Sequence, residues 1–240
     1  MTHQHSESPP FPIVGIGASA DGIEALQTFF EALPAELGAP VVVSVRISSE
    51  HRNELVPILA RNTKMPVEEV TGTVPLQADR VYIVSPDWRL RITDTEVDVL
   101  TPDQSRPQRM SINLFLQSLA EQYNDVFAVI LSGSGADGAS GVKAVKERGG
   151  IVLVQDPSEA AFDGMSRAAI GTFSMAVRCF RPKMSLSRGR IQALLCVSSK
   201  RSCSKRRRGC RLHTTRPMPL IRKWLRPMRN SRASTRNTGP

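Results

Sequence analysis

Two glycine-rich turns constrain the fold more than any other feature of this sequence. The first is GIGASADG, residues 15–22, and the second is SGSGADG, residues 132–138. Each follows an apolar run and precedes a segment with the periodicity of a helix. Turns that lead from a strand into a helix lie at the carboxyl edge of a parallel sheet, where open α/β folds bind their ligands. We therefore expect the two turns to meet in one cleft.

Strand and helix patterns alternate through residues 11–172. The run at 40–45 is rich in valine, which is typical of a strand that is buried on both faces. We expect helices at 23–33, 53–62, 111–123 and 141–148, and strands at 12–16, 40–45, 66–70, 80–84, 89–92, 96–100, 126–131 and 151–155. The predicted fold class is α/β, a doubly wound and mainly parallel sheet with helices on both faces.

Charge divides the chain into two parts. Residues 1–172 hold 13 Lys and Arg against 22 Asp and Glu, whereas residues 173–240 hold 19 Lys and Arg and no acidic residue. The net charge of +10 for the whole chain is therefore misleading for the first part, and we expect no nucleic acid to bind there. The predicted organisation is a disordered N-terminus (1–10), an α/β domain (11–172) and a basic tail (173–240).

The basic tail has three possible interpretations. It is disordered, it is the translation of a shifted reading frame, or it binds nucleic acid or an acidic membrane surface through runs such as 205–208. All four cysteines lie in it, without the paired spacing of a zinc site. We expect no metal and no cofactor. No run approaches the about 18 apolar residues of a membrane span, and we see no signal peptide, so we expect a cytoplasmic protein without membrane insertion.

Each glycine-rich turn places one reactive side chain at the start of its helix: Ser19 in the first and Asp137 in the second. A serine among the unpaired N–H groups of a helix N-terminus can attack an ester, and those groups stabilise the resulting oxyanion. The other reading is that both side chains only cap helices. The backbone candidates for the oxyanion site are Ala20, Gly133, Ser134 and Gly135.

Both turns also fit the Rossmann pattern Gly-x-Gly-x-x-Gly/Ala. After the second turn, Asp156 follows at the end of a strand, where a ribose-binding acid would lie. Asp21 and Asp137 argue against a bound pyrophosphate, because a carboxylate in the turn would repel it. A dinucleotide-binding domain is therefore the less favoured alternative to a hydrolase.

Five ordered segments form a specific pattern: Gly-Ala-Ser at 17–19, LARNTKMPV at 59–67, VYIVSP at 81–86, GSGADG at 133–138 and FDGMSRAAI at 162–170. Together they resemble the CheB-type protein-glutamate methylesterase domain, above all the version in CheB–CheR fusion proteins. The resemblance implies a serine hydrolase of chemotaxis-type signalling that removes methyl esters from receptor glutamates and releases methanol. It also implies two kinds of partner, a methylated chemoreceptor or related signalling protein, and a CheR-type methyltransferase.

The resemblance implies a Ser–His–Asp triad, with Ser19 as the nucleophile and Asp137 as the aspartate. In the family the histidine follows the second strand, and this chain has Arg46 there. Arginine stays protonated in proteins, so it cannot accept the serine's proton. We expect Arg46 to pair with Asp137 instead, and esterase activity to be impaired. The alternative is a catalytically inactive methylesterase-like binding module.

Two further residues bear on activity. His51, five residues after Arg46, is a histidine that could lie near the expected site. Asp21 stands where the family has the first of two glycines, and it adds negative charge near the oxyanion. Asp21 lowers the expected activity further, and His51 could replace the missing histidine only if it reaches Ser19.

Overall fold

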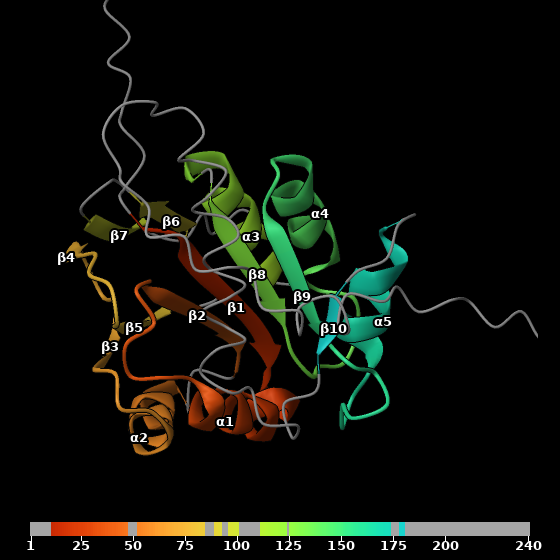
Figure 1. Ribbon diagram of the computed structural model, residues 1–240, viewed down its shortest axis with the longest axis horizontal. Coiled ribbons are helices and arrows are strands. Elements are labelled where there is room, and N and C mark those ends of the chain that lie inside the picture. The colour runs from red at the N-terminus through yellow and green to blue at the C-terminus, as the bar shows by residue number, and fades with distance from the viewer. Residues whose placement is uncertain are drawn as a thin grey trace, which may run out of the picture. The chain divides into compact units, whose positions relative to one another are not determined.

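A seven-stranded parallel sheet forms the centre of the protein, with strand order β10-β9-β8-β1-β2-β5-β3 (Figure 1). The computed structural model describes residues 11–47, 52–84, 89–92, 96–100, 111–123, 125–173 and 178–180. The strands are β1 (Ile13–Ser19), β2 (Val41–Arg46), β3 (Val67–Glu69), β5 (Val81–Val84), β8 (Val126–Ile130), β9 (Ile151–Gln155) and β10 (Arg178–Phe180).

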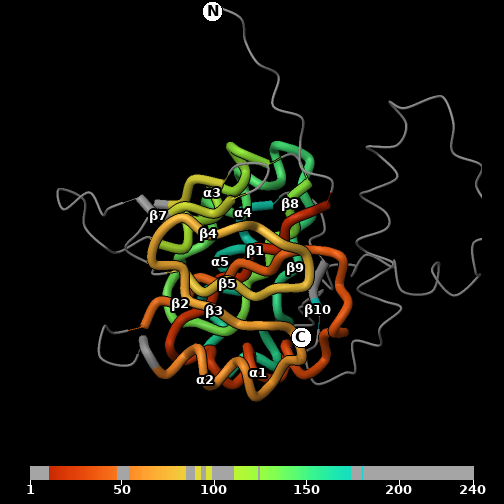
Figure 2. Tube along the Cα trace, turned by 90° about the vertical axis from the view of Figure 1, so that its left-hand side faces the viewer, coloured from red at the N-terminus to blue at the C-terminus, as the bar shows by residue number. Residues whose placement is uncertain are grey.

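Helices cover both faces of this sheet, as the α/β pattern predicted. Helices α1 (Ile23–Ala32) and α2 (Arg52–Asn62) lie on one face, and α3 (Ser111–Gln122) and α4 (Ala139–Glu147) lie on the other (Figure 2). Helix α5 (Gly164–Gly171) packs with α3 and α4, since its buried Met165 and Ala169 belong to the same cluster of side chains. Each face has its own cluster of buried side chains: Phe30 and Leu59 belong to the first cluster, and Leu116 and Val142 belong to the second. Burial of these apolar surfaces is the main stabilising contribution to the fold.

A small antiparallel sheet accompanies the main one. It has the order β4-β7-β6, from β4 (Val74–Pro75), β7 (Glu96–Leu100) and β6 (Arg89–Ile92). Its buried residues Leu90, Ile92 and Val97 join the cluster beneath α3. Among the described helices, none has the length and apolar character needed to cross a membrane.

Strand β1 turns alternate residues to opposite faces, and this alternation explains its glycines. Ile16 and Ala18 pack in the cluster beneath α1, so Gly15, Gly17 and Ser19 face α3. A Cβ atom on Gly15 would overlap a methyl group of Leu119 in α3, and one on Gly17 would overlap a methyl group of Ile112. The glycines thus let α3 approach the sheet closely.

The main sheet continues past residue 172, where the sequence predicted the end of the domain. Strand β10 pairs in parallel with β9, and the ring of Phe180 packs edge-on against Phe29 of α1, with centroids 5.6 Å apart. The predicted boundary is therefore too early. Basic residues around this short strand obscured it in the sequence. Residues 1–10 and 181–240 lie outside the described residues, so the interpretations of these segments stay predictions.

Candidate active site

Ser19 is the last residue of β1, at the carboxyl edge of the sheet. Its backbone N–H donates to the carbonyl of Ser132, which follows β8, at 3.4 Å. A Cβ atom on Gly133 would lie 3.0 Å from Ser19 Oγ, so the hydroxyl sits directly against the second turn. Strands β1 and β8 are adjacent and parallel. The two glycine-rich turns therefore meet, as the sequence predicted.

The Ser19 side chain does not cap the helical turn that follows it. Ser19 occupies the N-cap position of η1 (Ala20–Gly22), yet its side chain makes no capping hydrogen bond there. Instead Ser19 Oγ donates to Oδ2 of Asp21 at 3.4 Å. The Ser134 hydroxyl donates to the same carboxylate oxygen at 3.3 Å. Ser19 is only 2% exposed, whereas Asp21 is exposed.

Asp137 caps a helix, but it is not the helix that follows it in the chain. The N-cap of α4 is Gly138, with φ 93° and no side-chain capping bond. The buried Asp137 carboxylate instead accepts N–H groups at the start of α3, from Ile112 at 3.2 Å and from Asn113 at 3.0 Å, and from Gly138 at 2.9 Å. A carboxylate at this position also complements the positive end of the α3 dipole.

Arg46 lies directly across from Ser19 on the neighbouring strand, since these two residues are in register between β1 and β2. Its guanidinium donates from Nη2 to the carbonyl of Ser134 at 3.1 Å. Because β2 and β8 flank β1, this hydrogen bond spans the end of β1 where Ser19 lies.

The predicted ion pair between Arg46 and Asp137 is wrong. The salt bridges among the described residues do not include it. The physical reason is that three backbone N–H groups already donate to the Asp137 carboxylate. The Arg46 guanidinium instead donates to the carbonyl of Ser134 in the second turn. His51, the other predicted base, lies outside the described residues.

The backbone candidates for the oxyanion site differ in what they can offer. The N–H of Gly133 donates to the carbonyl of Phe162 at 2.9 Å, so it is not available to a ligand. Ser134 and Gly135 are exposed, and their N–H groups have no partner among the described residues. Ala20 is also exposed. The predicted oxyanion donor Gly133 is therefore a packing residue, and Ser134 and Gly135 are the candidates with free N–H groups.

The packing and backbone of the chain itself account for glycines of the Rossmann-like pattern. A Cβ atom on Gly17 would overlap a methyl group of Ile112, and one on Gly133 would overlap the sulfur of Met165. Gly135 and Gly138 have positive φ, 86° and 93°, which favours glycine. Asp156 accepts the N–H and hydroxyl of Ser158 at 3.0 and 2.7 Å, which closes the turn after β9. The residues proposed for a dinucleotide thus hold the chain's own turns together.

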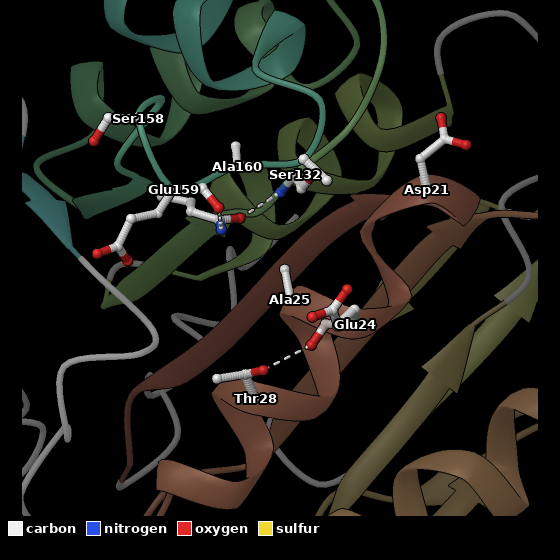
Figure 3. Close-up of a pocket in the computed structure, with 10 residues that line it drawn as sticks. Asp21, Glu24, Ala25, Thr28, Ser132, Ser158, Glu159 and Ala160 are labelled. Carbon is white, nitrogen blue, oxygen red and sulfur yellow. Dashed lines mark hydrogen bonds between the residues drawn. The ribbon is translucent and has the colours of Figure 1, made fainter.

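A pocket of about 200 Å³ opens beside Asp21. Figure 3 shows its wall formed by Asp21 and Glu24 of the η1–α1 segment and by residues around Glu159 after β9. All its charged lining residues are acidic, and Ser132 connects it to the turn that contacts Ser19. The charge favours neutral or cationic groups over anions. Glu24 and Glu159 were not predicted as site residues, because they come from distant segments without a shared motif.

Comparison with known proteins identifies the family. Residues 14–184 match the model of the CheB methylesterase family. The chain belongs to this family. Over 77% of the chain and 98% of the other structure, it superposes on the crystal structure of the Thermotoga maritima CheB methylesterase catalytic domain, with a TM-score of 0.66 and 25% identity.

Sequence relatives agree with this family membership. A putative protein-glutamate methylesterase/protein-glutamine glutaminase of Leptospira interrogans is 32% identical, over 69% of this chain and 86% of the relative. The protein-glutamate methylesterase/protein-glutamine glutaminase 2 of Cupriavidus metallidurans is 36% identical over 70% of this chain. The chain spans 51% of that second relative.

Removing the Asp137 carboxylate should destabilise this CheB-type domain. Asp137→Ala leaves the amides of Ile112 and Asn113 without acceptors inside the protein, so the free energy of unfolding should fall by about 2–4 kcal/mol. Urea denaturation followed by circular dichroism measures this. The control is Asp163→Ala, which removes an exposed ion pair with Arg167 and should cost less than about 1 kcal/mol. Equal effects of the two variants would contradict the capping role.

Proposed function

We propose that this chain is a methylesterase of chemotaxis-type signalling that attacks γ-glutamyl methyl esters through Ser19. Its substrate would be a methylated chemoreceptor or related signalling protein, and a CheR-type methyltransferase would supply the ester. The observation that carries the proposal is the placement of Ser19: it ends β1, contacts Gly133 in the second turn, and lies in register with Arg46. The names of the relatives support the same ester chemistry.

The proposed reaction uses groups at the carboxyl edge of the sheet. Ser19 Oγ attacks the ester carbonyl, and the free N–H groups of Ser134 and Gly135 stabilise the oxyanion. Asp137 holds the start of α3 against the second turn. The relatives' names also include glutaminase activity, but an amide has a poorer leaving group than a methyl ester. We therefore propose the ester as the substrate.

Arg46 impairs this reaction, because a guanidinium cannot take the proton of Ser19. Loss of a triad member typically costs about four to six orders of magnitude in turnover. At the position where the family has its base, Arg46 donates a hydrogen bond to the Ser134 carbonyl. The proposed esterase is therefore slow.

Methanol release from a methylated receptor tests the proposal. The unaltered chain should release methanol slowly, and Ser19→Ala should release none above the buffer, because the nucleophile is gone. Ser140→Ala is the matched control, since Ser140 is an exposed serine on α4, and it should leave the rate unchanged.

The alternative of an inactive binding module predicts a different result. In that case the unaltered chain, Ser19→Ala and Arg46→His would all stay at the buffer level, although each is folded by circular dichroism. That outcome would overturn the esterase proposal.

A further inference from the structure

We propose that Asp21 accepts the proton of Ser19 in this chain, in place of the histidine for which Arg46 is substituted. This inference rests on the proposed esterase function. Asp21 is the only carboxylate that Ser19 Oγ contacts among the described residues, with 3.4 Å between the two oxygens. Hydrogen bonds of catalytic groups are often long without substrate and shorten in the substrate complex.

The partners of Asp21 leave it able to act as a base. Its described hydrogen bonds come from two hydroxyls, those of Ser19 and Ser134, and both reach Oδ2. Asp137 is different, because three backbone N–H groups occupy its carboxylate. No ion pair in the described part of the chain involves Asp21. Of the two acidic residues in the glycine-rich turns, Asp21 is therefore the one that is free to take a proton.

The fold holds Asp21 close to the nucleophile. Asp21 lies in the single turn η1, two residues after Ser19. The next residue, Gly22, packs its Cα against the carbonyl of Ser132, which prevents η1 from moving toward β8. Asp21 is also one of the residues that line the acidic pocket (Figure 3).

Asp21 would carry the proton from Ser19 to the leaving methoxide, and later from water back to Ser19. As Ser19 Oγ bonds to the ester carbon, its proton passes to the Asp21 carboxylate. The resulting carboxylic acid protonates the departing methoxide, so methanol leaves and an acyl-enzyme remains. Water next attacks the acyl carbon and gives a proton to Asp21. That proton returns to Ser19 Oγ as the acyl bond breaks, and the glutamate side chain is released.

Labelling by a fluorophosphonate tests this role, because the probe bonds covalently to an activated serine and loses fluoride. Asp21→Asn should label about 10²- to 10⁴-fold more slowly than the unaltered chain, the usual contribution of a general base. Glu31→Gln is the matched control: it removes one negative charge from an exposed position on α1, outside the pocket, and should label at the unaltered rate. Equal labelling of Asp21→Asn and Glu31→Gln would overturn the inference.

A histidine background separates proton transfer from a structural role. In Arg46→His the imidazole supplies a second base, so adding Asp21→Asn should slow labelling by less than about 10-fold. If Asp21→Asn slows both backgrounds equally, the residue only positions the turn and the inference fails. If Ser19→Ala labels as fast as the unaltered chain, or if neither the unaltered chain nor Arg46→His releases methanol, the proposed function itself fails.

The pH dependence of labelling gives an independent readout. An imidazole is half protonated near pH 6.5, so labelling of Arg46→His should fall as the pH drops from about 8 to about 6. Labelling of the unaltered chain should not show this fall. The other charged groups around the site are Glu24 and Glu159 in the pocket and Arg46, which bonds the Ser134 carbonyl. An imidazole-like pH profile in the unaltered chain would overturn the inference and indicate His51 as the base.

Discussion

Replacing Arg46 with histidine should raise the rate of methyl-ester hydrolysis by about two to four orders of magnitude. Arg46 is in register with Ser19 on the neighbouring strand, so an imidazole at this position lies beside the nucleophile. The imidazole can accept the Ser19 proton, which the guanidinium cannot. The gain should stay below the full contribution of a triad histidine, because Asp21 already accepts the Ser19 proton in the unaltered chain and Asp137 is engaged at the start of α3.

Methanol release from methylated receptor measures this gain, with Ser19→Ala as the blank. Arg46→Gln is the matched control, because it removes the guanidinium without supplying a base and should not increase the rate. If Arg46→Gln gains as much as Arg46→His, the arginine obstructs the site and the absence of the imidazole is not the cause. If the folded Arg46→His variant gains nothing, the defect lies elsewhere in the chain.

A methyl group at Gly22 should lower both stability and nucleophile reactivity. In Gly22→Ala the new Cβ would overlap the carbonyl oxygen of Ser132, and backbone atoms cannot move aside as a flexible side chain can. Such overpacking costs about 1–3 kcal/mol of unfolding free energy. Because Gly22 follows Asp21 directly, the shift should also separate Asp21 from Ser19 and slow fluorophosphonate labelling.

Gly72→Ala is the control for this substitution, since nothing lies within 4 Å of a Cβ there and the backbone is not left-handed. Urea denaturation should show a change of less than about 0.5 kcal/mol for Gly72→Ala. A Gly22→Ala variant as stable as Gly72→Ala would show that the two turns are not packed as described.

Local patterns were sufficient to predict the fold. The valine-rich run at 40–45 became the buried strand β2, and the periodic segment at 111–123 became α3 (Ser111–Gln122). Such patterns predict correctly because each strand or helix buries a face that its own residues define. Strand β10 was not predicted, since it is short and its Phe180 packs against Phe29, a residue far away in the chain.

The candidate site was only partly predictable. Ser19 and its turn were identified, because a strand that enters a helix at the carboxyl edge has a recognisable pattern. The partner of Arg46 was predicted wrongly as Asp137. The opposite charges of Arg46 and Asp137 suggested that pair, but in the fold the carboxylate accepts hydrogen bonds from the buried amides at the start of α3. Sequence alone does not reveal which helix end lies nearest to a buried acid.

By itself, therefore, the sequence determined the α/β architecture, the meeting of two glycine-rich turns, and the arginine at a position where the family has its base. Those properties depend on periodicity, turn chemistry and residue identity, which are local. Only the tertiary structure decided that Asp21 takes the Ser19 hydrogen bond, that Asp137 caps α3, and that Arg46 spans the end of β1 to Ser134. Those contacts depend on competition among donors and acceptors that meet only when distant segments pack together.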